Sequence, residues 1–158
     1  ETAASNDSWI GWHNDSGFLT ALAGDLYFDP ATGKVVDTKP QNTGLQIVDR
    51  SDAPRLVTIP PDCMAVQIGE CTQILTGGLV VATPHSVRGA PGIARASLAC
   101  FIDTPPGFPL TMPDGVTRQQ VIKSQQSKLV PPLELRWKQS GMTFGDFLQT
   151  TFEHYYDW

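Results

Sequence analysis

The chain has 158 residues, of which 41% are apolar and 17% are charged, and its formal net charge is −5. This length suits one compact domain, and no apolar run approaches the ~18 residues of a membrane span. The acidic balance and the lack of a Lys/Arg cluster argue against a nucleic-acid partner. The 14 glycines and 13 prolines favour short strands joined by turns over a helical bundle.

Short apolar runs separated by turn residues predict a β-rich region through the first two thirds of the chain. Residues 29–34 predict a turn, and the polar stretch up to residue 43 predicts an inserted surface loop or hairpin. Residues 70–76 predict a single helical turn, and the four prolines of residues 104–113 take that stretch out of the sheet. The predicted strands are residues 44–50, 56–59, 63–68, 80–87 and 94–102.

The last third of the chain predicts helices. Thr143 and Asp146 have the spacing of a capping box, and apolar side chains follow at helical spacing. This stripe consists of Phe144, Phe147, Leu148, Phe152 and Tyr155. A shorter helix is predicted over residues 117–128, with Val121 and Ile122 facing the core. We therefore expect a mainly β core, residues 1–113, with a helical extension, residues 114–158, packed on it.

The cysteine pattern bears on the compartment. Cys63, Cys71 and Cys100 make an odd count, and no two have metal-finger or Cys-x-x-Cys spacing. Free thiols in a reducing compartment are the main expectation; a bridge such as Cys63 with Cys71, or a redox role, is the alternative. With no signal sequence at the start, this predicts a cytoplasmic protein. The chain begins with Glu1, so we expect a processed protein or a piece of a longer one.

Two histidines and one aspartate are the candidate metal ligands. His13 and Asp15 are two residues apart, so both side chains point to one face of an extended segment. For this pair alone, surface positions are the alternative. His85 lies in the predicted strand 80–87. Two histidines and one carboxylate are the ligand set of the facial triad, which binds Fe(II) and leaves open positions.

Arg95 and Ser97 are the candidate ligand-binding residues. By the two-residue period they share one face of the predicted strand 94–102, opposite its apolar residues. Because a buried unpaired charge is costly, Arg95 requires an anionic partner. The carboxylate of a small ligand, held by the guanidinium with a hydroxyl beside it, would meet this requirement.

The order of these residues resembles the isopenicillin N synthase-like family of Fe(II)/2-oxoglutarate-dependent dioxygenases. The shared pattern is His-x-Asp, then a distal His, then Arg-x-Ser ten residues later. The resemblance covers residues 9–108. Further parts of the chain are similar to the family pattern: residues 12–20, 44–47 and 66–78, and Phe101 with Pro105.

The resemblance implies a double-stranded β-helix, or jelly-roll, core followed by C-terminal α-helices. It implies that His13, Asp15 and His85 bind Fe(II). Arg95 and Ser97 would then bind the distal carboxylate of 2-oxoglutarate, the co-substrate. The implied activity couples the oxidative decarboxylation of 2-oxoglutarate by O2 to the hydroxylation or desaturation of a small organic substrate.

Departures from the family pattern leave alternatives open. Only 12 residues precede His13, where family members have a helical region and the first core strands. We therefore expect a missing N-terminal region or a second chain to complete the fold. Ser86 stands where the family usually has an arginine. The alternatives are a 2-oxoglutarate-independent iron oxidase and a non-catalytic jelly-roll fragment that serves as an interaction or structural subunit.

Overall fold

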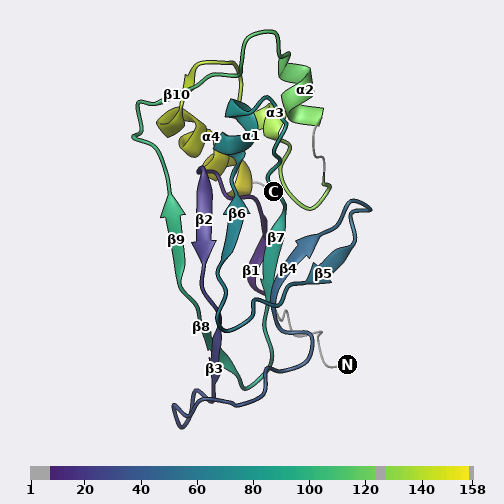
Figure 1. The fold of residues 1–158 in the computed structure, drawn as a ribbon, viewed down its shortest axis with the longest axis vertical. Coiled ribbons are helices and arrows are strands. Elements are labelled where there is room, and N and C mark those ends of the chain that lie inside the picture. Colours follow the sequence, from purple (N-terminus) through teal and green to yellow (C-terminus); the bar gives the residue numbers. More distant parts are fainter. Residues whose placement is uncertain (1–7, 124–126, 157–158) are drawn as a thin grey trace.

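The structure, a computed structural model, describes residues 8–123 and 127–156 and is mainly β, with its helices gathered at one end (Figure 1). The helices are α1 Glu70–Leu75, α2 Arg118–Lys123, α3 Leu133–Arg136 and α4 Phe144–Tyr156. The strands are β1 Ser8–His13, β2 Leu19–Leu22, β3 Leu26–Phe28, β4 Gly44–Val48, β5 Pro54–Leu56, β6 Ala65–Ile68, β7 His85–Arg88, β8 Ala94–Ala96, β9 Ala99–Ile102, β10 Pro109–Leu110 and β11 Met142–Thr143.

Strand pairing brings distant segments of the chain together. Among the described residues, one antiparallel sheet has the order β1-β7-β4-β5 and a second has the order β6-β2-β9. β3 pairs with β8, and β10 pairs with β11. The register places His13 opposite His85 and Tyr27 opposite Arg95. The sheets therefore bring the candidate metal ligands together and give Arg95 a neighbour from β3.

The main hydrophobic core lies at the helical end. Trp137 and Phe147 have no exposed surface there, and burying a side chain of this size stabilises the fold by about 1.5–3 kcal/mol. The core draws on all the described helices and on β10. Its buried members are Cys71, Ile74, Leu110, Val121, Ile122, Leu133, Trp137, Phe144 and Phe147.

The predicted C-terminal helix is confirmed, including its cap. The Thr143 hydroxyl accepts a hydrogen bond from the Asp146 backbone N–H at 3.2 Å and donates one to its carboxylate at 2.7 Å. Phe144 and Phe147 are buried as predicted, but Phe152 is 59% exposed, so its place in the apolar stripe is wrong. At 100° per residue, Phe152 lies about 80° around the helix from Phe144, which turns it out of the core.

The other predicted elements fit in part. The turn at residues 70–76 is α1, and Val121 and Ile122 of α2 are buried; residues 124–126 of that predicted helix lie outside the described residues. The predicted strand 80–87 begins only at His85, because Pro84 has no N–H to donate to a ladder. The short helix α3 was not predicted.

Two predicted strands are wrong in extent. Residues 94–102 do not form one strand but split after Ala96 into β8 and β9, which belong to different sheets. The predicted strand 56–59 lies earlier in the structure, as β5, where Arg55 pairs with Ile47 of β4. In both cases the partner strands, which the local pattern does not reveal, determine where pairing stops.

The segment between β3 and β4 is the predicted surface insertion. Its turn closes through a hydrogen bond from the Gly33 N–H to the Asp29 carbonyl, and Val35 forms an isolated β-bridge with Phe28.

All three cysteines, which fall within the described residues, are free thiols, and no disulfide joins Cys63 to Cys71. Across the described parts of the chain, no helix is long and apolar enough to span a bilayer. The division after residue 113 and the cytoplasmic location remain predictions.

Candidate functional site

The structure brings His13, Asp15 and His85 together, although the last is 70 residues away in sequence. The Asp15 Oδ1 atom lies 3.5 Å from Nε2 of His85 and 3.9 Å from Nε2 of His13. The two imidazole rings have their centroids 4.1 Å apart. One ligand atom from each residue lies within 4.8 Å of the others, so the three side chains form one potential metal site.

Backbone carbonyls orient both imidazoles. Nδ1 of His13 lies 2.8 Å from the Gly11 carbonyl oxygen, and Nδ1 of His85 lies 3.1 Å from that of Thr83. A carbonyl only accepts hydrogen bonds, so each Nδ1 carries a proton and donates it to its carbonyl. Burial, aided by the charge of His13 and opposed by Asp15, lowers the pKa of His85 to about 4. His85 is therefore neutral at pH 7, the form that binds metals.

Thr20 and Gln67 hold the carboxylate of Asp15. The Thr20 hydroxyl and the Gln67 amide donate hydrogen bonds to Asp15 Oδ2 at 2.5 and 2.8 Å. The Gln67 amide nitrogen also lies 2.7 Å from Nε2 of His85. Thr20 and Gln67 are register partners on β2 and β6. Hydrogen bonds of this kind fix the orientation of a ligating carboxylate, here with Oδ1 directed at the two histidines.

Thr20 and Gln67 are site residues that were not predicted, although the sequence contains a signal for them. Each is a polar residue inside an otherwise apolar strand, in Leu-Thr-Ala-Leu of β2 and Ala-Val-Gln-Ile of β6. Thr20 is only 2% exposed. Because buried polar groups require partners, such positions in a strand point to a polar site beside it.

The chemistry and spacing of the triad suit Fe(II). Two neutral imidazoles and one carboxylate are the ligand set of non-haem iron oxygenases, with the remaining positions left open. Donor atoms that each lie about 2 Å from one ion are about 3 Å apart. The distances of 3.5 and 3.9 Å from Asp15 Oδ1 to Nε2 of His85 and of His13 are close to this spacing.

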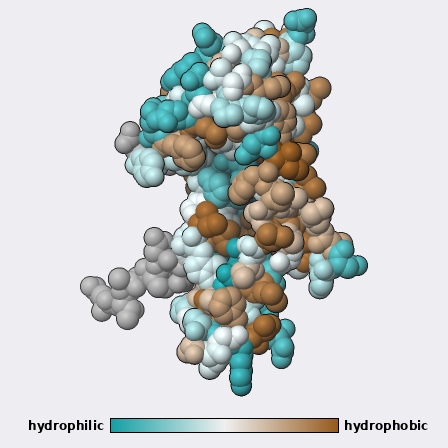
Figure 2. Space-filling view, turned by 90° about the vertical axis from the view of Figure 1, so that its left-hand side faces the viewer, coloured by the Kyte–Doolittle hydropathy of each residue, from teal (hydrophilic) through white to brown (hydrophobic). Residues whose placement is uncertain are grey.

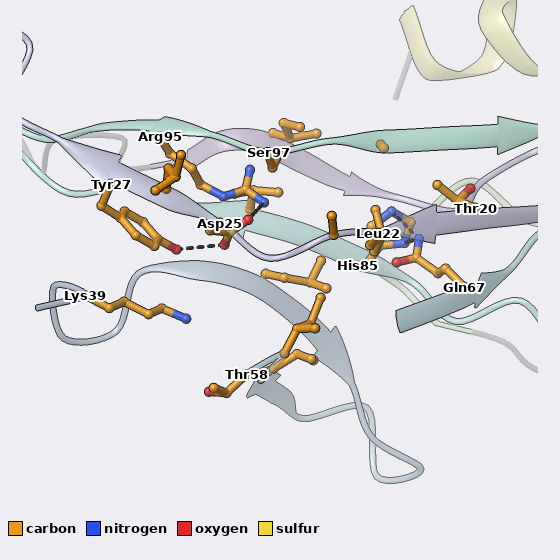
Figure 3. A pocket seen from close by; sticks show the side chains of 18 of the residues that line it. Thr20, Leu22, Asp25, Tyr27, Lys39, Thr58, Gln67, His85, Arg95 and Ser97 are labelled. Atoms are coloured by element: carbon orange, nitrogen blue, oxygen red, sulfur yellow. Dashed lines mark hydrogen bonds and ion pairs between the residues drawn. The ribbon is translucent and has the colours of Figure 1, made fainter. Parts of the chain in front are cut away.

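A cavity of about 400 Å³ extends from the triad, and Arg95 and Ser97 line it as well (Figure 3). This volume is typical of a site for a small molecule. Apolar side chains form much of the wall between the two groups, among them Leu22, Leu45 and Val87. Arg95 and Ser97 therefore line the same cavity as the potential metal ligands, although Ser97 lies after the end of β8 and not on a strand shared with Arg95.

The end of the cavity beyond Arg95 contains a polar cluster that the sequence analysis did not identify. Nη2 of Arg95 forms an ion pair with Oδ1 of Asp25 at 2.7 Å, and the Tyr27 hydroxyl donates to Oδ2 at 2.9 Å. Burial, and then the hydrogen bond with Asp25, raise the pKa of Tyr27 to about 12, so this phenol remains a donor at neutral pH. The anionic partner that Arg95 requires is thus present within the chain.

A buried polar network ties the segment that carries His13 and Asp15 to the helical end. Asn14 lies between His13 and Asp15 in the sequence. Its backbone N–H donates a hydrogen bond to the Tyr155 hydroxyl at 3.0 Å, and the Asn14 side-chain amide donates one to Glu70 at 2.9 Å. Glu70 also forms a two-pronged ion pair with Arg136, at 2.5 and 2.6 Å. Both side chains are almost fully buried. The helices thereby fix the backbone of the candidate metal site.

Comparisons with known proteins agree with this geometry. Residues 4–104 match the sequence model of the 2OG-Fe(II) oxygenase superfamily. No curated protein matches the sequence. Among solved structures, a full-length Neurospora crassa protein in complex with alpha-KG is 17% identical with a TM-score of 0.61, over 96% of this chain and 39% of that one.

Two further solved structures share the fold. A 2OG-Fe(II) oxygenase family protein from Caulobacter crescentus is 20% identical with a TM-score of 0.55, over 91% of this chain and 39% of that one. JOX2 in complex with 2OG, Fe and JA is 23% identical with a TM-score of 0.60, over 91% of this chain and 34% of that one. The chain thus spans well under half the length of these proteins.

The family match covers well over half of the chain and contains His13, Asp15, His85, Arg95 and Ser97. Structures that share its fold were solved with 2-oxoglutarate and with iron, the cofactors of this superfamily. This mainly β chain with C-terminal helices belongs to the 2OG-Fe(II) oxygenase superfamily.

Proposed function

We propose that this protein is a non-haem iron oxygenase of the isopenicillin N synthase-like class, which couples the oxidative decarboxylation of 2-oxoglutarate to the hydroxylation or desaturation of a small organic substrate. One observation carries the proposal. His13, Asp15 and His85 converge at one cavity, and Arg95 and Ser97 line that same cavity.

His13, Asp15 and His85 are the proposed Fe(II) ligands. Bound Fe(II) together with 2-oxoglutarate supplies the activation of O2, which no side chain can provide. The chain itself keeps His85 neutral at pH 7, places a backbone carbonyl against Nδ1 of each imidazole, and holds Asp15 through Thr20 and Gln67. Two histidines and one carboxylate would leave further positions of a bound ion open for 2-oxoglutarate and O2.

Arg95 and Ser97 are the proposed binding residues for the distal carboxylate of 2-oxoglutarate. Arginine binds carboxylates through paired N–H groups, and the serine hydroxyl is an additional donor. Apolar side chains such as Leu45 and Val87 line the same cavity. An apolar wall suits a substrate that presents a C–H bond.

A double-stranded β-helix core, completed by polypeptide beyond these 158 residues, is the proposed architecture. The sheets β1-β7-β4-β5 and β6-β2-β9 would be its two faces. Within the described residues β9 is an edge strand, and Ala99–Ile102 are all exposed. Figure 2, which faces the side where β9 lies in Figure 1, shows apolar surface gathered below the helical end. A further region of a longer protein, or a second chain, would cover this edge.

An anaerobic titration with Fe(II) and 2-oxoglutarate tests the proposed activity. A chelated 2-oxo acid gives a weak visible charge-transfer band, so the titration reports both metal and co-substrate. We expect a saturable band in the wild type, no band in Asp15→Ala, and a weaker affinity for 2-oxoglutarate in Arg95→Ala.

Other outcomes separate the alternatives. Iron binding without the band would favour a 2-oxoglutarate-independent iron oxidase, in which Arg95 and Ser97 bind a substrate carboxylate. A folded protein that binds no iron would contradict the proposed activity for this chain. That result would favour a non-catalytic subunit, and circular dichroism of the same samples checks that each variant is folded.

A further inference from the structure

Asp25 is placed against Arg95, where a carboxylate ligand would be expected. It precedes β3, and its Oδ1 atom lies 2.7 Å from Nη2 of Arg95 on β8. The two side chains are only 18% and 15% exposed. In such a half-buried site charges are less screened than at the surface, so this pair attracts strongly and a second negative charge is repelled strongly.

Tyr27 holds Asp25 from its other side. The Tyr27 hydroxyl donates to Oδ2 of Asp25 at 2.9 Å, so each carboxylate oxygen has a partner. Tyr27 is 5% exposed and pairs with Arg95 across β3 and β8. Figure 3 shows the three side chains in a row, with both interactions drawn. Asp25 is therefore a fixed part of the cavity wall.

Arg95 retains capacity for a further acceptor. Its Nε atom is buried and has no hydrogen-bond partner among the described residues. A guanidinium offers five N–H donors arranged along its edges, and Asp25 contacts it through Nη2. A ligand carboxylate can thus reach Arg95, but it does so beside the like charge of Asp25.

Lys39 brings a second cation to this end of the cavity. A Cβ atom on Gly44 would lie 3.0 Å from Nζ of Lys39 and 2.6 Å from the Tyr27 hydroxyl oxygen, so these two polar atoms adjoin. Gly44 has a φ of +101° and leaves this space open. Lys39 comes from the insertion between β3 and β4, and in Figure 3 its ammonium lies below Tyr27.

We propose that Asp25 is an internal counter-ion of Arg95 that lowers the affinity of the cavity for the distal carboxylate of 2-oxoglutarate. This inference rests on the proposed function. The ligand carboxylate must share Arg95 with Asp25 or displace it toward Tyr27 and Lys39. Asp25 is then a specificity-determining residue, because it reduces the difference in affinity by which the site favours a dicarboxylic 2-oxo acid over a monocarboxylic one.

The test compares two ligands and three proteins. Fe(II)-loaded wild type, Asp25→Asn and Asp37→Asn are titrated anaerobically with 2-oxoglutarate and with 2-oxobutyrate, which lacks the distal carboxylate. Dissociation constants come from the visible band and from calorimetry. Asp37 also lines the cavity but is exposed, so its variant removes the same charge without touching Arg95. Asparagine keeps an acceptor for Arg95, and Asp25→Ser is the second variant if Asp25→Asn does not fold.

We expect Asp25→Asn to bind 2-oxoglutarate roughly tenfold more tightly, the size expected when a like charge near the ligand carboxylate is removed from a half-buried site. Its affinity for 2-oxobutyrate should change less than about twofold, and Asp37→Asn should change neither constant by more than about threefold.

Equal or weaker binding of 2-oxoglutarate by Asp25→Asn would overturn the inference while leaving the proposed function intact. Weaker binding would mean that Asp25 orients Arg95 for the ligand. An equal gain for both ligands would also overturn it, because the effect would then not involve the distal carboxylate. Metal binding with no 2-oxoglutarate binding in any variant would refute the proposed function and this inference together.

Discussion

The two ends of the molecule differ in how tightly their apolar side chains are packed. At the helical end, Trp137 and Phe147 are fully buried in the hydrophobic core. At the strand end, the sheets surround a cavity of about 400 Å³, and large apolar side chains such as Leu98 and Phe101 are 69% and 62% exposed. A cavity leaves its lining atoms without packing partners, so it contributes less to stability than a filled core. Stability is thus concentrated at one end and the candidate chemistry at the other.

A short polar bridge links these ends. Glu70 and Arg136 belong to the helical end, yet Glu70 accepts a hydrogen bond from Asn14 and donates its backbone N–H to the Asp15 carbonyl at 2.8 Å. The geometry of the candidate metal ligands therefore depends on a buried ion pair outside the cavity. Four experiments test this division between the two ends.

The largest difference is expected between two phenylalanines. Phe147→Ala removes a fully buried ring from the helical core and should lower the free energy of unfolding by about 3–5 kcal/mol. Phe101→Ala, the same chemical change on exposed β9, should cost less than about 1 kcal/mol. Urea denaturation of both variants measures the difference. Similar losses would show that the strand end is as tightly packed as the helical end.

Breaking the ion pair between Glu70 and Arg136 should lower the free energy of unfolding by nearly as much. Arg136→Met leaves Glu70 buried without its cation, which typically costs about 3–5 kcal/mol. The double variant Glu70→Gln with Arg136→Met should recover part of the loss, because no buried charge then remains. Arg55→Met, which removes an exposed ion pair, is the control and should leave the urea midpoint unchanged. A stable Arg136→Met single variant would argue against the bridge.

Alkaline pH should destabilise the folded protein through the buried phenol of Tyr155. Burial, and then the charge of Glu70, raise the pKa of Tyr155 to about 12 from its ordinary value of 10. Between pH 10 and 12 the unfolded chain loses a phenol proton that the folded protein keeps. Stability is therefore complete below pH 10 and falls as the pH rises toward 12, by on the order of 2 kcal/mol.

Urea midpoints measured from pH 9 to 12 check this effect of Tyr155. Tyr155→Phe should show a shallower decline than the wild type. Some decline remains in the variant, because the pKa of Tyr27 is also raised to about 12. Tyr156→Phe, on a side chain that is 90% exposed, is the control and should match the wild type. An unchanged slope in Tyr155→Phe would mean that this phenol is not buried in solution.

The smallest effect is expected at the strand end. Thr20→Val removes the hydroxyl that donates to Asp15 and should weaken metal binding by about tenfold, as is typical for groups that orient a ligand. Competition with a chromophoric chelator for Fe(II) measures the affinity. Thr58→Val, on another threonine of the same cavity, is the control. Equal affinities in the two variants would show that Thr20 does not orient the carboxylate.

Features that depend on local sequence were predictable. The Thr143 cap with Asp146, and the burial of Val121 and Ile122, follow from helical periodicity over a few residues. The spacing of His13 and Asp15, and that of Arg95 and Ser97, follows from the two-residue period of extended chain. Each of these inferences compares residues that are close in sequence, where backbone geometry determines which side chains share a face.

The chain alone thus determined the mainly β composition, the C-terminal helix and the residues that converge on one cavity. Tertiary structure decided the partners of those residues: Asp25 for Arg95, Gln67 for Asp15, and Arg136 for Glu70. Glu70 and Arg136 are 66 residues apart. The physical reason is that such contacts depend on which strands pair and in which register, and pairing is set by packing over the whole fold.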